Sequence, residues 1–205
     1  MRRSGLFSGG WVCIKTGLFS LLIAGCSGRE NHATPSLPFP AQMGPFERVE
    51  APVKGRSGVL AGYQLTLPAG TVIATVQRRP APGGESLLPI LDKGAADAGA
   101  LAEAELVRSM AQIRRFYPNV SIDTTRSFLL LRGGQLRPAR GAIVAYQEEV
   151  DGQVHTLKMD VVVVCCTEGH EVVEYRFRHN ATVTVELEEA AFMRNFPWTA
   201  IEAMR

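Results

Sequence analysis

An excess of charge of one sign is what this sequence most clearly lacks. Its 22 lysines and arginines are balanced by 20 aspartates and glutamates, which leaves a net charge of +2. Proteins that bind nucleic acid normally carry a concentrated basic patch or a basic tail. No long run of lysine and arginine is present, so the sequence predicts no nucleic-acid partner.

Cysteine is also scarce, and its four copies fall into two groups. Cys13 and Cys26 lie near the start, whereas Cys165 and Cys166 are adjacent to each other, a pattern that is not a disulfide framework. Neighbouring residues of a strand point to opposite faces, so we expect Cys165 and Cys166 to pack as small apolar side chains. A bond between the two would require a distorted strand.

Long apolar runs are missing as well. The apolar stretch at 17–25 is far shorter than the ~20 residues that span a bilayer. It follows the basic residues Arg2, Arg3 and Lys15 and ends in small side chains. A basic start, a short apolar middle and a small-residue end are typical of a secretory signal peptide.

The signal ends in Leu22-Ile23-Ala24-Gly25-Cys26, which resembles the lipobox of bacterial lipoproteins. The resemblance implies cleavage between Gly25 and Cys26 and attachment of acyl chains, palmitate among them, to Cys26. Two or three chains anchor a protein stably where one is marginal. Ser27 follows the cysteine, and in Gram-negative members of this class that residue implies the outer membrane, facing the periplasm.

Composition divides the rest of the chain into two parts. Residues 26–45 contain the lipidated cysteine and a flexible tether rich in proline and small polar residues. Residues 46–205 are predicted to form one domain, and residues 1–25 are the signal peptide.

The domain is expected to be α+β: an antiparallel sheet packed with a long central helix and a C-terminal helix. The sheet comprises an N-terminal hairpin at 60–67 and 71–77 and a three-stranded C-terminal meander. The central helix, 95–117, has an apolar face formed by Ala102, Leu106, Met110, Ile113 and Tyr117. The second helix, 184–195, is predicted to bury Leu187, Ala190 and Ala191.

Turns set the predicted register of the meander. Asp151-Gly152 favours a two-residue type I′ turn, which places Val150 opposite Gln153 and Tyr146 opposite Leu157. A three-residue turn at Glu168-Gly169-His170 would then place its strand partners as follows: Val173 opposite Cys165, Tyr175 opposite Val163 and Phe177 opposite Val161. Val162 and Val164 are apolar on the other face, which indicates a strand covered on both sides.

This order of elements resembles PsbP-like domains, in topology alone, over about residues 60–198. The resemblance implies an exported binding or assembly module, and it transfers no functional residue to this chain.

The usual enzyme motifs are absent: no nucleophile elbow, zinc-protease helix or phosphate-binding loop occurs. We therefore predict no catalytic residue and no cofactor, and a lipid-anchored binding or assembly module with envelope proteins as partners. The alternative is a copper or zinc carrier, or an enzyme, that uses Cys166 and His170, with His155 or His179 as a further ligand, although paired zinc-ligand spacings are lacking. Glu174, Arg176 and Arg178 share a strand face, which is either solvated or helix-facing, or else an anion site.

The lipid anchor is testable in cells. A clickable fatty acid should label the wild-type chain and should not label a Cys26→Ala variant, because the thiol that accepts the lipid is gone. Incorporation of label into Cys26→Ala would contradict the lipobox interpretation, and a Cys13→Ala variant serves as the matched control that keeps its label.

Overall fold

The computed structural model describes residues 39–55, 58–81, 95–132, 135–165 and 171–197. Nine strands and two helices lie in these ranges. In chain order they are β1 (Gln42–Met43), β2 (Phe46–Arg48), β3 (Val53–Gly55), β4 (Gly58–Leu67), β5 (Gly70–Pro80), α3 (Ala95–Phe116), β6 (Ser121–Arg132), β7 (Gln135–Val150), β8 (Gln153–Val164), β9 (Glu171–Asn180) and α4 (Glu186–Arg194).

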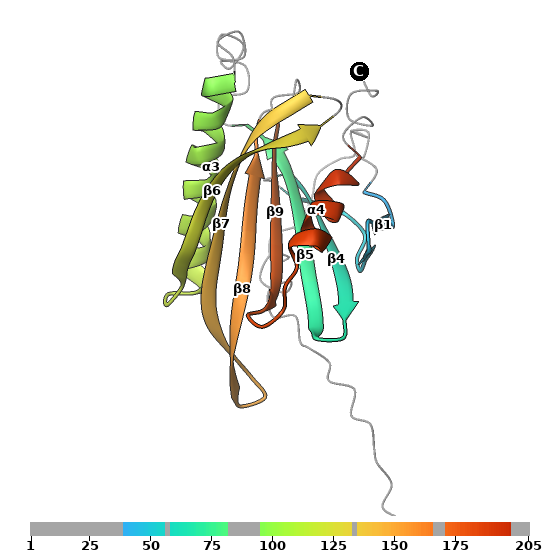
Figure 1. The fold of residues 1–205 in the computed structure, drawn as a ribbon, viewed down its shortest axis with the longest axis vertical. Coiled ribbons are helices and arrows are strands. Elements are labelled where there is room, and N and C mark those ends of the chain that lie inside the picture. The colour runs from blue at the N-terminus through green and yellow to red at the C-terminus, as the bar shows by residue number, and fades with distance from the viewer. Residues whose placement is uncertain (1–38, 56–57, 82–94, 133–134, 166–170, 198–205) are drawn as a thin grey trace, which may run out of the picture. The chain divides into compact units, whose positions relative to one another are not determined.

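All nine strands belong to one antiparallel sheet. Its order is β1-β2-β4-β5-β9-β8-β7-β6, and β3 pairs with β4. The β4–β5 hairpin joins the β6–β9 meander through β5 and β9, so the two expected sheet parts are continuous (Figure 1). The predicted α+β class is therefore wrong: a large antiparallel sheet dominates the described chain, and α3 and α4 only cover parts of it.

The Asp151-Gly152 hairpin forms with the predicted register. Val150 pairs with Gln153 and Tyr146 with Leu157. Asp151 and Gly152 have φ angles of 52° and 77°, the positive values that a type I′ turn requires. The helix predicted over 95–117 and the hairpin predicted over 60–67 and 71–77 are also confirmed, as α3, β4 and β5.

The predicted register between β8 and β9 is wrong by one residue. Tyr175 pairs with Val162, not with Val163, and Phe177 pairs with Asp160, not with Val161. A one-residue shift turns every side chain of β9 to the opposite face. The apolar pattern could not reveal this, because β8 is buried on both faces and accepts apolar neighbours on either one.

Helix α3 covers one face of the sheet. Its side chains pack against the faces of β7 and β8 that carry Val144 and Val161. Ala102, Leu106, Met110 and Ile113 are buried as predicted, whereas Tyr117 lies just beyond the helix and is partly buried. The helix also buries Glu105 and Ser109. Burying the apolar side chains, each contributing roughly 1.5–3 kcal/mol, holds the helix on the sheet. Neither described helix is long and apolar enough to cross a bilayer.

The opposite face of the sheet is covered by α4 and the chain before β1. Phe192 of α4 lies 4.9 Å from the ring of Phe46, 5.1 Å from Tyr63 and 5.3 Å from Phe177 (ring centroids), each nearly edge-on. Figure 1 shows α4 in front of β5 and β4. Edge-on aromatic pairs add about 0.5–1.5 kcal/mol each to the area they bury, so this cluster fixes the helix in place.

Two details of this face differ from the expectation. Leu187, predicted to be buried, is 82% exposed, and α4 buries Glu189, Phe192 and Met193 instead. Phe39 and Met43, assigned above to the tether, lie in the core. The packed chain thus includes residues before 46.

The packing of α4 leads to a stability test. Phe192→Ala should lower the free energy of unfolding by about 3–5 kcal/mol, because it leaves a cavity among four aromatic rings. Leu187→Ala on the same helix should change it by less than about 0.5 kcal/mol. Urea titration followed by circular dichroism measures both, and equal effects of the two substitutions would contradict the observed orientation of α4.

Candidate functional site

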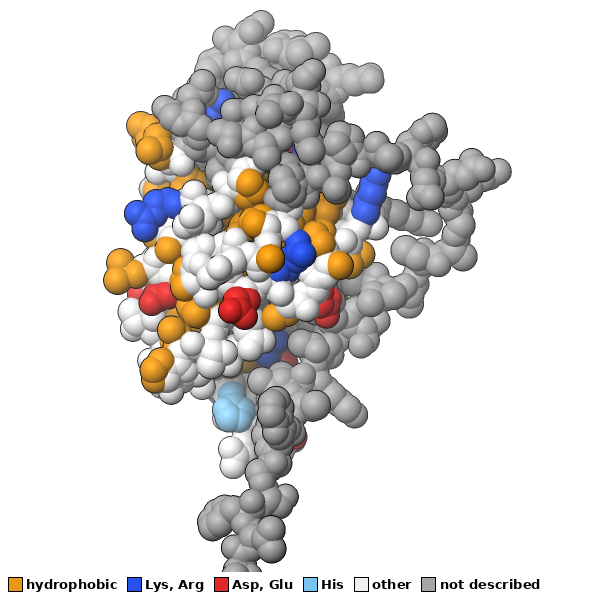
Figure 2. Space-filling view, turned by 90° about the vertical axis from the view of Figure 1, so that its right-hand side faces the viewer, with side chains coloured by type: hydrophobic (Ala, Val, Ile, Leu, Met, Phe, Trp, Pro, Cys, Tyr) orange, Lys and Arg blue, Asp and Glu red, His pale blue; other side chains and the backbone are white. Residues whose placement is uncertain are grey.

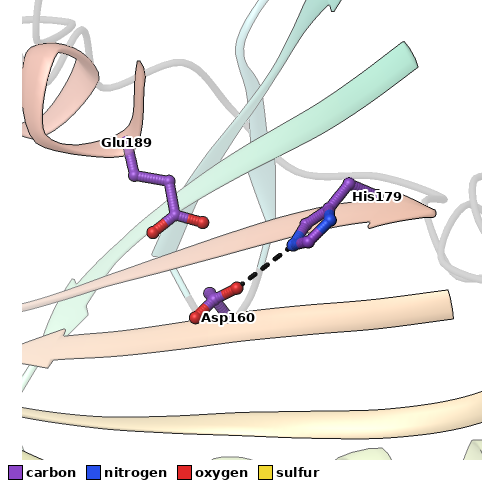
Figure 3. Close-up of side chains that lie close together, drawn as sticks. All are labelled: Asp160, His179 and Glu189. Carbon is purple, nitrogen blue, oxygen red and sulfur yellow. Dashed lines mark hydrogen bonds and ion pairs between the residues drawn. The ribbon is translucent and has the colours of Figure 1, made fainter. Parts of the chain in front are cut away.

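Four charged or titratable side chains meet under α4. Arg126 comes from β6, Asp160 from β8, His179 from β9 and Glu189 from α4; we call them the α4-face cluster. Figure 3 shows His179 and Glu189 both pointing toward Asp160. The strand between β6 and β8 carries Gly141 beside Arg126, and a methyl group there would lie 3.2 Å from the Arg126 side chain. The missing side chain leaves room for Arg126 to lie across β7 and reach Asp160.

The nitrogen–oxygen distances between side chains of the cluster are long, and the one short contact joins His179 to a backbone carbonyl. Nδ1 of His179 lies 2.8 Å from the carbonyl oxygen of Asn180, and Nε2 lies 3.3 Å from Oδ2 of Asp160. Nη2 of Arg126 lies 3.5 Å from Asp160 Oδ1 and 3.7 Å from Glu189 Oε2. A carbonyl oxygen only accepts, so Nδ1 of His179 carries a proton and Nε2 faces the carboxylates.

Burial controls the protonation of Glu189. Desolvation, and next the nearby carboxylate of Asp160, raise its pKa from 4.5 to about 9, while the charge of Arg126 acts in the opposite direction. Glu186, earlier on α4, adds a smaller repulsion. A buried carboxyl of this kind holds its proton near neutral pH unless a cation replaces it.

The donor set has a definite chemistry. Asp160, His179 and Glu189 each offer one ligand atom, and these atoms lie within 4.8 Å of one another. All three side chains are buried, so the cluster is closed to a large substrate. The arrangement suits the exchange of a proton or the binding of a small cation, and it lacks the open cleft of most enzyme sites.

A second buried charge cluster lies under α3. Glu174 of β9 accepts hydrogen bonds from Ser109 Oγ at 2.6 Å and from Arg176 Nε at 2.5 Å, and Arg79 lies 3.5 Å from its other oxygen. Glu105 of α3 is paired with Arg79 in turn. The face that carries Glu174 and Arg176 is thus the one that faces α3. Its arginines form ion pairs with carboxylates of the same domain.

Arg178 follows the same rule, since its guanidinium pairs with Glu148. Both arginines of this strand face are therefore paired with carboxylates of the protein. The geometry favours a packed face over the anion site that the sequence also allowed.

The residues predicted from sequence as sites lie elsewhere. Gly25, Cys26, Cys166 and His170 fall outside the described residues, so the lipidation site and the alternative metal pair remain predictions. Cys165 is buried, as expected, but it is disulfide-bonded, which corrects the expectation of a free thiol. Its partner also falls outside the described ranges.

Sequence reasoning missed the α4-face cluster. Its members come from four separate elements, and only the three-dimensional sheet brings them together. Asp160 lies on the face of β8 opposite to Val161. The sequence held one indication of this cluster: Asp160 directly precedes four valines that are buried, and an acidic residue in such a buried strand needs a partner.

The described surface holds one shallow hollow worth note, of about 330 Å³, beside β2 and β4. Glu47, Arg48 and Gln64 line it, with four neighbours. It is open and polar, unlike the enclosed apolar cavities that bind small molecules. Figure 2 views the molecule from this side and shows charged side chains scattered singly rather than gathered in a block of one sign.

Comparisons with known proteins add little to this description. No family model matches the chain, and no curated protein matches its sequence. A solved structure of PA94, a protein of unknown function from Pseudomonas aeruginosa, is similar with a TM-score of 0.42 and 13% identity, over 73% of this chain and 92% of that one. A likeness at this level carries no argument about fold or function.

The protonated state of Glu189 predicts how stability depends on pH in chelator-treated protein. The folded chain holds a proton that the unfolded chain releases, because the carboxyl pKa is about 9 when folded and near 4.5 when unfolded. Its contribution is full below about pH 4.5 and is lost as pH rises toward about 9, by at most about 1.4 kcal/mol per pH unit.

Urea titration at intervals between pH 5 and 9 measures this slope. Glu189→Gln should flatten it, because the amide cannot ionise, whereas Glu188→Gln on the same helix should keep it. An unchanged slope in Glu189→Gln would show that the carboxyl is not the group responsible.

Proposed function

We propose that the chain is a lipoprotein held to a membrane through Cys26, and that its domain is a non-catalytic binding or assembly module of the cell envelope. The lipobox sequence that ends in Cys26 carries the first part of the proposal. The second part is supported by the described domain, whose helices cover only parts of the sheet and leave other parts of its surface open to partners.

One surface is suited to a partner more than the others. Leu129 and Leu131 of β6 and Leu136 of β7 are 59%, 62% and 61% exposed. Leu131 pairs directly with Leu136 across the β6–β7 hairpin, and Leu129 pairs with Pro138, so the three leucines share a face. We call them the leucine surface. Neighbouring exposed leucines of this kind mark interaction sites more often than isolated ones do.

The edge of the sheet lies beside the leucine surface. β6 is the last strand, and no strand in the described part of the chain pairs with its outer edge. Natural proteins usually protect such edges with charge, yet residues 127–131 read Ser-Phe-Leu-Leu-Leu. Backbone groups on a free edge bind extended chain, and apolar side chains add specificity. We therefore propose an extended, apolar segment of an envelope protein as the partner.

Site-specific photo-crosslinking in cells tests this proposal. A photoreactive amino acid at position 131 should yield one discrete adduct with an envelope protein, because the partner strand would lie against it. The same amino acid at position 187, which is even more exposed at 82%, should yield none.

The outcomes separate the alternatives. Equal adducts from both positions, or none from position 131, would overturn the proposal. An adduct with twice the mass of the chain would mean that a second copy occupies the edge, which contradicts an envelope protein as the partner.

A further inference from the structure

We infer that Asp160, His179 and Glu189 form a binding site for one first-row divalent metal ion, of the Zn²⁺ type, which joins α4 to the sheet. The inference rests on the ligand atoms themselves, which lie within 4.8 Å of one another in a buried site. It goes beyond the proposed binding module and does not depend on the lipid anchor.

The orientation of His179 is the first argument. Its Nδ1–H is directed at the carbonyl oxygen of Asn180, 2.8 Å away. Histidines that bind metals through Nε2 regularly donate the other ring N–H to a backbone carbonyl or a carboxylate, which fixes the ring and its tautomer. In the neutral ring this leaves a lone pair on Nε2, 3.3 Å from Oδ2 of Asp160. Two acceptors at that distance repel each other unless a proton or a metal ion lies between them.

Glu189 supplies the second and independent argument. Its side chain is 3% exposed and points into the cluster (Figure 3). Oε1 of Glu189 is buried and meets no hydrogen-bond donor among the described side chains, and the carboxyl lies close enough to Asp160 to share a proton with it. A buried carboxylate oxygen without a partner is costly, and a metal ion shared with Asp160 and His179 would satisfy it.

Arg126 is the competing cation, and its position is consistent with a metal site. Its guanidinium lies at 3.5 Å from Asp160 and 3.7 Å from Glu189, beyond ordinary hydrogen-bond lengths. Its side chain is 36% exposed and lies over the ring of Phe128, 5.6 Å from the centroid. Part of the arginine side chain can thus stay in contact with solvent while an ion occupies the buried side, although Nε of Arg126 is itself buried and has no hydrogen-bond partner in the described chain.

The ligand types select the metal. One imidazole with two carboxylates suits zinc and its first-row neighbours, whereas Mg²⁺ requires near-octahedral oxygen ligands and keeps several waters. Three protein ligands leave one position of a tetrahedral ion for water. Zn²⁺ is expected to bind more tightly than Mn²⁺, and Mg²⁺ is expected not to bind.

The test is titration of the untagged, chelator-treated full chain with Zn²⁺, Mn²⁺ and Mg²⁺, followed by calorimetry and elemental analysis. One zinc per chain is expected at this site, with a rise in melting temperature. His179→Gln should weaken zinc binding by at least about 10–100-fold, the loss that even an indirect partner of a metal causes. His155→Gln, a matched change on β8 outside the cluster, should not alter it.

Two further variants make the result decisive. Arg126→Gln keeps every proposed ligand and removes the competing charge, so it should bind zinc about tenfold more tightly or better. Cys166→Ala should keep this site, whereas zinc lost in Cys166→Ala and kept in His179→Gln would assign the metal to the alternative pair and overturn the inference. Absence of zinc binding by the folded wild type would also overturn it.

If His179→Gln fails to fold, the Arg126→Gln variant provides the test. An unchanged zinc affinity in Arg126→Gln would contradict a metal ion beside that arginine.

Discussion

Burial of the middle strands on both faces is the constraint on which the rest of this structure depends. Val161, Val162, Val163 and Val164 of β8 are all buried, two against α3 and two toward α4. An antiparallel sheet commonly keeps one face in water, and here two helices prevent that at the centre. A strand covered twice cannot alternate apolar and polar residues, so any polar side chain within it must find a partner inside the protein.

The two charge clusters follow from this constraint. Glu174 of β9 faces α3 and pairs with Arg79 and Arg176. Ser109 of α3 donates a hydrogen bond to it. Asp160 of β8 faces α4 and meets residues of β6, β9 and α4. Each helix therefore contributes polar side chains to the sheet as well as apolar ones, which fixes where along the strands it can lie.

The sequence predicted what local rules determine. Turn chemistry at Asp151-Gly152 set the β7–β8 register correctly, and helical periodicity identified the buried face of α3. The sequence could not predict the β8–β9 register, because both faces of β8 are apolar and β9 can pair with it in either of two registers. The predicted register placed Tyr175 beside Val163, whereas Tyr175 pairs with Val162. The buried face of α4 was not predicted because it includes an acidic residue, Glu189, and a buried helix face is normally recognised by its apolar residues.

The fold class was wrong for a related reason. The hairpin of β4 and β5 and the meander that follows α3 were each predicted as local units, but their union through β5 and β9 is a long-range pairing that no turn encodes. The α4-face cluster instead combines three strands of the meander, β6, β8 and β9, with α4. Sequence reasoning could recognise Asp160 and Glu189 as acids and could not bring them together.

The contrast between the two clusters gives the α4-face cluster its functional interest. Under α3, Oε1 of Glu174 accepts hydrogen bonds at 2.5 and 2.6 Å, and its other oxygen lies 3.5 Å from Arg79. Under α4, the nitrogens nearest to Asp160 lie at 3.3 and 3.5 Å, and one oxygen of Glu189 meets no hydrogen-bond donor in the described chain. The carboxylate of Glu174 thus has two short donors, and no nitrogen lies that close to Asp160 or Glu189 in the described chain. Because a half-satisfied buried network is costly, the α4-face cluster is a place where a proton or a metal ion would bring a gain in stability.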